Sequence, residues 1–333
     1  MRRIVTIILG FAALATVAFR DRVDHTITDV PGEWPRFENP PVGRIDLLPG
    51  LRGEGIPDLG QLTLAGAWQL VSPDPGFGNF SALGQFADGR MVTVGDRNTF
   101  MIFAPPDRRG PWRPILGRPF SKWVPGIGMQ SDSESLIVDA PTQHVLVGYE
   151  NASNLIWMNR AMEPIGKITV PALREWPPNQ GPEAMARLAD GRVVIVGEVN
   201  AHPFNRRLHP ALVFAGMPRS FEKPGRFEVT MPEGYRPTEL AQLPDGRLLL
   251  LARKFTIAGF RSVILTADPA QLHPGAVLQT QEIARIDDPR IRDNYEGMTV
   301  TRAADGSVSI WLISDSNLMV ALQRTLVLKL RFR

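Results

Sequence analysis

The chain of 333 residues contains no cysteine and only five lysines. The absence of cysteine excludes disulfides, thiolate catalysis and cysteine-based zinc sites. The basic residues are mostly arginines, and they are scattered without any run of five or six. Although the formal net charge is +3, this scatter argues against nucleic-acid binding, so we expect no nucleic-acid partner.

Several catalytic signatures are also missing. The sequence has no Gly-x-Ser-x-Gly elbow, no His-Glu-x-x-His, no Gly-rich phosphate loop followed by Lys, and no dinucleotide fingerprint. A serine mechanism of the α/β-hydrolase type, a zincin site and a nucleotide fold therefore have no support. The five histidines lie far apart in the sequence.

Long apolar runs are absent except for one at the N-terminus. After two arginines, residues 4–19 contain only two threonines as polar residues. A basic start followed by such a run is typical of an export signal. If it is not cleaved, it barely reaches the roughly 17–25 residues that span a bilayer. We therefore predict a signal peptide or anchor over 1–20 and a periplasmic or secreted protein, which contacts a membrane only through an uncleaved segment.

The remainder has the composition of a globular protein with many short strands. It is 44% hydrophobic, and its 30 Gly and 30 Pro are spread along the chain. Frequent turns between short apolar runs favour β-structure, and the recurring prolines argue against long helices. We predict an extension over 21–59, followed by one all-β domain over 60–333.

A repeated pattern indicates how that domain is built. An apolar run, an Asp-Gly turn and a second apolar run recur, which is a strong hairpin signal because Gly tolerates positive φ. Four copies are clear: 81–97 around Asp88-Gly89, 183–199 around Asp190-Gly191, 238–254 around Asp245-Gly246, and 296–317 around Asp305-Gly306. A degenerate fifth copy at 134–151 has Pro141-Thr142-Gln143 in place of Asp-Gly.

The copies begin about 50–60 residues apart, a spacing typical of propeller blades. The strand expected at 61–72 has no preceding hairpin, and the strand expected at 325–332 has no following neighbour. Pairing these two strands would close a ring and remove exposed sheet edges. The sequence therefore predicts a β-propeller of five or six blades, closed by its N- and C-terminal strands.

Polar residues stand at the open ends of the hairpins, opposite the Asp-Gly turns. If the hairpins are the inner strands of successive blades, these residues converge on one face around the central channel. The carboxylates are Asp96, Glu134, Glu150, Glu183, Glu198, Glu296 and Asp315, and Ser81, Thr238 and Glu239 occupy equivalent ends. Asn151, Asn294 and Asn317 add neutral oxygens, and Arg97 and Arg253 add positive charge.

Three explanations for this ring of carboxylates remain open. Ca²⁺ takes six to eight oxygens from carboxylates, amides and carbonyls, so the ring is a candidate cation site. Pairing with Arg97 and Arg253 would instead make it a structural salt-bridge network. In the third explanation, one carboxylate with a raised pKa serves as a general acid or base.

The sequence resembles the bacterial phytase-like ("esterase-like activity of phytase") family of exported propeller proteins. The resemblance lies in FGNFSALGQFADGRMVTVGDR (77–97), DSESLIVD and HVLVGYENASNLI (132–156), GPEAMARLADGRVVIVGE (181–198), and NYEGMTV, ISDSN and TLVLKL (294–330). Ser135 and Ala184 depart from the Glu-Gly that often occurs in the family. The motif positions matched are Asp96, Arg97, Glu134, Glu150, Glu183, Glu296, Asp315 and Asn317.

The resemblance implies hydrolysis of phosphate or carboxylic esters. The leading hypothesis is an exported, metal-assisted hydrolase acting on a small-molecule ester or phosphoester, with Ca²⁺ or another divalent cation. Glu183 and Glu296 are the candidate catalytic carboxylates, and Arg97 and Arg253 the candidate substrate-binding residues. The candidate metal ligands are Asp96, Glu134, Glu150, Asp315 and Asn317. The alternative is a non-catalytic envelope propeller that binds a ligand or partner on the same face; in either case we expect a monomer.

Overall fold

The computed structural model describes residues 41–96, 99–118, 132–150, 153–177, 180–257, 259–317 and 323–333. The predicted signal or anchor, the first half of the predicted extension, Arg97 and Asn151 lie outside these residues. A compact unit runs from Asn39 to Arg333. No helix in the described ranges is long and apolar enough to cross a membrane.

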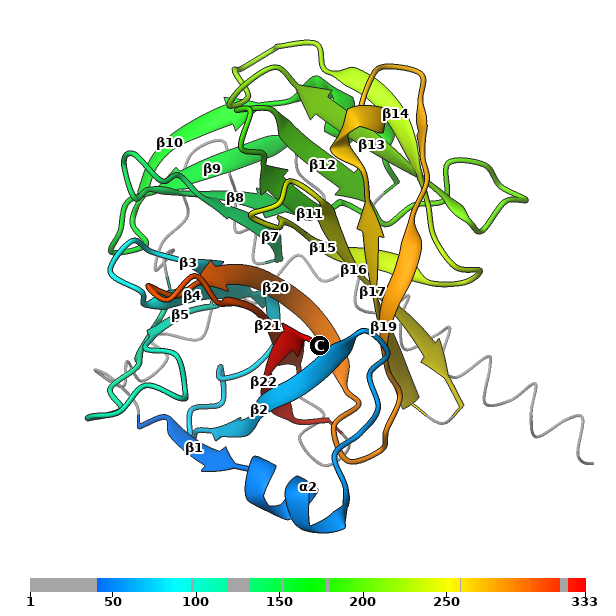
Figure 1. Ribbon diagram of the computed structural model, residues 1–333. Helices are drawn as coiled ribbons and strands as arrows, with labels where there is room; N and C mark the ends of the chain where they lie inside the picture. The colour runs from blue at the N-terminus through cyan, green and yellow to red at the C-terminus, as the bar shows by residue number, and fades with distance from the viewer. Residues whose placement is uncertain are drawn as a thin grey trace, which may run out of the picture. The chain divides into compact units, whose positions relative to one another are not determined.

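The described residues form five sheets, which we call blades 1 to 5 (Figure 1). Blade 1 contains β3 (Phe80–Gln85), β4 (Met91–Gly95), β5 (Thr99–Phe103) and β6 (Ile115–Gly117). Blade 2 contains β7 (Ser133–Val138), β8 (Val145–Tyr149), β9 (Asn154–Met158) and β10 (Pro164–Thr169). Blade 3 contains β11 (Pro182–Arg187), β12 (Val193–Gly197), β13 (Leu208–Phe214), β14 (Gly225–Thr230) and the parallel β18 (Val277–Leu278).

Blade 4 contains β15 (Arg236–Gln242), β16 (Leu248–Thr256), β17 (Gly259–Ala267) and β19 (Gln281–Ile286). Blade 5 contains β20 (Asn294–Arg302), β21 (Val308–Asp315), β22 (Thr325–Phe332), β2 (Leu62–Val71) and β1 (Gly43–Asp46). The helix α2 (Leu48–Glu54) and two 3-10 helices, η2 (Pro171–Glu175) and η3 (Pro269–Gln271), lie in the connections.

The blades form a closed ring. The inner strands β3, β7, β11, β15 and β20 each contact the next, and β20 contacts β3. Five apolar clusters lie at the five interfaces between neighbouring blades, so the core is divided among the interfaces. The predicted propeller is confirmed, and its blades number five among the described residues.

Blade 5 closes the ring as predicted. β22 lies between β21 and β2, and its register pairs Leu62 with Phe332 and Leu70 with Thr325. β1 adds to the outer edge of β2, so part of the predicted extension belongs to this blade. The indoles of Trp68 and Trp311 stack with ring centroids 5.8 Å apart across the joined strands.

The Asp-Gly turns have the predicted glycine conformation. In blade 1 the Gly89 N–H donates to Phe86 O at 2.9 Å, and Gly89 has φ 81°. The carboxylate of Asp88 accepts from the Arg90 N–H at 2.9 Å, which explains the polar residue before each glycine. In the degenerate copy Gln143 takes the left-handed conformation, with φ 59°.

Gly95, at the end of β4, lies where two backbone segments pack closely, and its substitution tests that packing. A Cβ on Gly95 would lie 1.7 Å from Asn79 O, a backbone atom that cannot move cheaply. We expect Gly95→Ala to lower the free energy of unfolding by about 1–3 kcal/mol, the usual cost of overpacking. Urea denaturation measures this change.

Gly50→Ala is the matched control, since a Cβ there meets nothing within 4 Å and the residue lies in α2. It should leave stability unchanged or raise it slightly, because Ala is a better helix former. Equal stability of the two variants would contradict the packing argument.

Candidate active site

In each hairpin, the polar residue predicted at the open end of the first strand lies at the same irregularity of the backbone. In every inner hairpin the strand register shifts at the same place, so one residue has no partner on the neighbouring strand. Such an extra residue is a β-bulge, a feature that re-aims a side chain near functional sites. The five unpaired residues are Ser81, Glu134, Glu183, Thr238 and Glu296, and all are buried.

The polar residues predicted at the open end of the second strand of each hairpin lie at the same end of the blade as the bulge residues. Asp96, Glu150 and Glu198 directly follow β4, β8 and β12, and Asp315 ends β21. Arg253 takes the corresponding place in blade 4, within the longer strand β16. The ring therefore has carboxylates from four blades and a guanidinium from the remaining one.

Carboxylates converge in one half of the ring. Asp96, Asp132 and Glu134 each offer an oxygen within 4.8 Å of the others, and Glu134, Glu150 and Glu183 form a second such group. Two oxygens bound to one Ca²⁺ at 2.3–2.6 Å lie at most about 5 Å apart, so each group fits one cation. Glu134 belongs to both groups. Asp132, two residues before it, was not predicted.

Arginine pairing characterises the other half. One Arg253 nitrogen lies 3.1 Å from Glu296 Oε1 and 3.7 Å from Glu198 Oε1, and Arg236 lies 3.2 Å from Glu198 Oε2. The Asn294 amide donates to Glu296 Oε1 at 2.8 Å and to Asp315 Oδ2 at 3.1 Å. The buried Asn294 Oδ1 has no partner among the described residues, which leaves a neutral oxygen beside the carboxylates.

Burial and crowding raise the pKa of the ring carboxyls. Burial, with Asp132 beside it, raises the pKa of Glu150 to about 9. Burial and neighbouring carboxylates raise the pKa of Glu134 and Glu183 well above their usual range. Burial also raises the pKa of Glu296, although Arg253 opposes this. A bound cation would favour the charged forms and offset this cost.

Asn317 and Arg97 are not placed in the cluster. Asn317 is exposed, and its backbone N–H, not its side-chain oxygen, contacts Asp315 at 2.7 Å from Oδ1. Arg97 lies outside the described residues, as does Asn151. The structure therefore brings the predicted carboxylates and Arg253 together. Of Asn317, predicted as a neutral ligand, only the backbone N–H contacts this cluster.

Glu239 has a position that sequence reasoning did not anticipate. Only 1% exposed, its carboxylate accepts the Leu240 N–H at 3.0 Å and the Leu83 N–H at 3.4 Å. The N–H groups of Met185 and Met298 also donate to it, although burial raises the pKa of this carboxyl well above its usual range. Each of these four donors stands two residues after the bulge of its blade, so Glu239 links four inner strands just beyond the ring.

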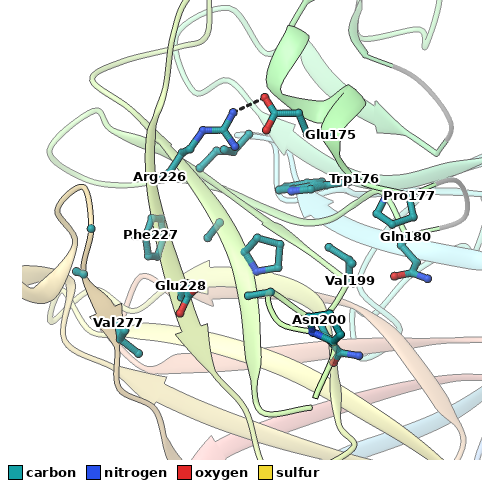
Figure 2. A pocket seen from close by; sticks show the side chains of 17 residues that line it. Glu175, Trp176, Pro177, Gln180, Val199, Asn200, Arg226, Phe227, Glu228 and Val277 are labelled. Carbon is teal, nitrogen blue, oxygen red and sulfur yellow. Dashed lines mark hydrogen bonds and ion pairs between the residues drawn. The ribbon is translucent and has the colours of Figure 1, made fainter. Parts of the chain in front are cut away.

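A groove lies on blade 3 (Figure 2). Its volume is about 810 Å³, and it is lined by residues that follow η2, residues that follow β12, and parts of β13, β14 and β18. Gln180 in its wall stands three residues before Glu183, and Val199 directly follows Glu198. Two lining residues are thus close in sequence to the two ring carboxylates of blade 3.

Comparisons with known proteins agree with this architecture. The family model described as "Phytase-like: Esterase-like activity of phytase" matches residues 59–318. An endo-arabinase from Bacteroides thetaiotaomicron is 10% identical with a TM-score of 0.52, and the match covers 78% of this chain and 95% of that one. A PQQ-bound aldose sugar dehydrogenase from Streptomyces coelicolor is 11% identical with a TM-score of 0.46, covering 84% and 100%.

At 10% identity the match to the endo-arabinase shows a similarity of fold alone. A search of curated proteins found no match to the chain.

The raised pKa values predict a pH dependence of stability. A carboxyl with a higher pKa in the folded state binds protons more tightly there, so its stabilising effect is full below the unfolded value, near 4.5, and is lost as the pH rises through the folded value. Each unit of pKa difference corresponds to about 1.4 kcal/mol. We therefore expect the chelated protein to lose stability continuously from pH 5 to pH 9.

Urea denaturation in EDTA across this range measures the slope. Glu150→Gln should flatten it, whereas Asp245→Asn should not, because Arg247 holds the pKa of that turn carboxyl below its usual range. A wild-type protein that becomes more stable from pH 5 to pH 9 would contradict the assignment.

Proposed function

Because the chain belongs to the phytase-like family, we propose that it is a hydrolase of phosphoesters or related esters, acting at the mouth of the propeller channel. The observation that carries this proposal is the convergence of Asp96, Asp132 and Glu134, and of Glu134, Glu150 and Glu183, on cation-sized spaces. Carboxylates that served only as structural ion pairs would each need an arginine. In the described part of the chain, only Glu198 and Glu296 of the ring have one.

The residues fit a hard divalent cation such as Ca²⁺. The two carboxylate groups supply anionic oxygens, and the unpartnered Asn294 Oδ1 supplies a neutral oxygen near Glu296 and Asp315. When bound, such a cation polarises a phosphoryl or carbonyl oxygen and lowers the pKa of a coordinated water. The proposed ligands are thus Asp96, Asp132, Glu134 and Glu150. Asp315, from the blade next to that of Asp96, and Asn317 are further candidates.

Glu296 is the proposed general base. Both of its contacts, from Arg253 and Asn294, are made to Oε1, which leaves Oε2 to accept a proton from the attacking water. The water oxygen bonds to phosphorus or to the acyl carbon, the ester C–O or P–O bond breaks, and the alcohol leaves with a proton. Glu183, which has no ion pair in the described part of the structure, is the second carboxylate able to move that proton.

Arg253 is the proposed substrate-binding residue, with Arg97 as a second candidate. The Arg253 side chain is 24% exposed, so it can approach a phosphoryl or carbonyl oxygen at the surface of the ring. Its pairing with Glu198 and Glu296 fixes the guanidinium at the edge of the carboxylate cluster. A positive charge there would stabilise negative charge developing on the substrate.

We also propose that the protein is exported and acts as a monomer on a small molecule. The proposal of export is supported by the basic start and apolar run of residues 1–20. If this segment is not cleaved, it would be the part of the protein that contacts a membrane. A non-catalytic envelope platform is the alternative. The Arg236–Glu198–Arg253 pairing favours that role locally, whereas the unpaired carboxylates of blades 1 to 3 favour catalysis.

Metal content tests the cation site. We expect the purified protein to contain a stoichiometric divalent ion by mass spectrometry, and chelation to lower its melting temperature. At a Ca²⁺ concentration of 100 Kd the ion should add about 2.7 kcal/mol to the free energy of unfolding.

Because Glu134 belongs to both groups, Glu134→Gln should abolish all binding, whereas Asp96→Asn should affect one group only. Asp245→Asn, in a turn at the other end of its blade, is the control. A protein that holds no ion and does not respond to chelator or Ca²⁺ would overturn the cation site.

Activity against aryl phosphates and aryl esters tests the catalytic assignment. We expect Glu296→Gln to lower kcat by about 10²–10⁴-fold, the usual contribution of a general base. Asp245→Asn should leave kcat unchanged. Unchanged hydrolysis in both Glu183→Gln and Glu296→Gln would show that neither carboxylate takes part.

A further inference from the structure

The groove on blade 3 differs in character from the ring. Its wall includes the side chains of Trp176, Pro177, Val199, Phe227 and Val277, drawn in Figure 2. These are apolar groups, whereas the ring consists mostly of carboxylates. A ligand that occupies both regions must therefore have two chemically different parts.

The lining of the groove carries three charged side chains, of which two form an ion pair. Arg226 is the only basic residue in its lining, and it contacts Glu175 Oε1 at 2.5 Å (Figure 2). The third charged residue, Glu228, lies 2.9 Å from His202 Nε2. The described lining therefore has one guanidinium, which is already paired with a carboxylate, and two carboxylates that would repel an additional anionic group.

We propose that this groove binds the uncharged organic group of the substrate, so that the enzyme acts on esters with a single phosphoryl or acyl group on a neutral, ring-sized moiety. This inference rests on the proposed hydrolase function. The reacting group would lie at the ring, and the remainder would extend past Gln180 and Val199 into the groove.

The same chemistry disfavours substrates with many phosphates. Each phosphate monoester carries about −1.5 to −2 charges at pH 7. A cation and Arg253 provide compensation for one such group at the ring, but a second phosphate in the groove would meet an arginine already bound to Glu175. Burying it without a free counter-charge would cost affinity.

The size and walls of the groove fit a ring-shaped group. About 810 Å³ lies within the roughly 300–1,000 Å³ typical of small-molecule sites. The Trp176 indole packs on the backbone of Gly197, where a Cβ would lie 3.1 Å from three ring atoms, so the wall is held in place. The side-chain amides of Gln180 and Asn200 add hydrogen-bonding groups to the lining (Figure 2).

Steady-state kinetics with two probes test this inference. The probes are 2-naphthyl phosphate, with one phosphate on an apolar ring, and inositol hexakisphosphate, with six phosphates. Val277→Trp fills the groove from an exposed position in β18, and Asn200→Trp fills it from the β12 side if the first variant folds poorly. Ile165→Trp, also on an exposed residue but outside the lining, is the matched control.

We expect 2-naphthyl phosphate to have the higher kcat/KM. The groove variants should raise its KM at least 10-fold while leaving methyl phosphate hydrolysis and the control unchanged. A higher kcat/KM for inositol hexakisphosphate, or an unchanged KM in folded groove variants, would overturn the inference.

Binding of 2-naphthol, the product, separates this inference from the hydrolase proposal. Naphthol binding that is weakened at least 10-fold by Val277→Trp but not by Ile165→Trp supports the groove, even if no ester is hydrolysed and the proposed function fails. Naphthol that does not bind, or that binds all variants equally, overturns the groove assignment even if esters are hydrolysed.

Discussion

The crowding of like charges in a buried space is the constraint on which the organisation of this protein depends. Carboxylates that approach within 4.8 Å of one another repel strongly, and burial raises their pKa. The compensation is unequal around the ring. In one half Arg253 supplies positive charge and Asn294 donates hydrogen bonds, whereas the carboxylates around Glu134 have no arginine within ion-pair distance among the described residues. That imbalance makes the second half the candidate cation site.

Blade 4 differs from the other blades in the residues that it contributes to the ring. Where other blades have a carboxylate after the second strand, this blade has Arg253, and its bulge residue is Thr238. The next residue, Glu239, holds the N–H groups of four inner strands. Among the described residues, blade 4 thus supplies both the guanidinium of the ring, from Arg253, and the carboxylate of Glu239, which links the inner strands.

Local patterns were sufficient to predict the fold and most of the carboxylates of the ring. Apolar runs around Asp-Gly turns specify hairpins, and strands without neighbours at both ends imply closure; both features depend on nearby residues. The bulges, Asp132, the contacts of Glu239 with neighbouring inner strands and the groove were not predicted, because each depends on register or on contacts between blades. The conformation of Asn317 could not be predicted either, because the spacing of residues does not determine the conformation of a turn.

The closure of blade 5 has a consequence for how the protein is made. β22 must insert between β21 and β2, although Leu62 and its partner Phe332 lie at opposite ends of the described chain. Such non-local pairing slows folding. Until residues 325–332 have been synthesised and delivered, the edge of β2 remains unpaired and open to association with other chains. We therefore expect ring closure, rather than formation of any single blade, to be the vulnerable step in biogenesis.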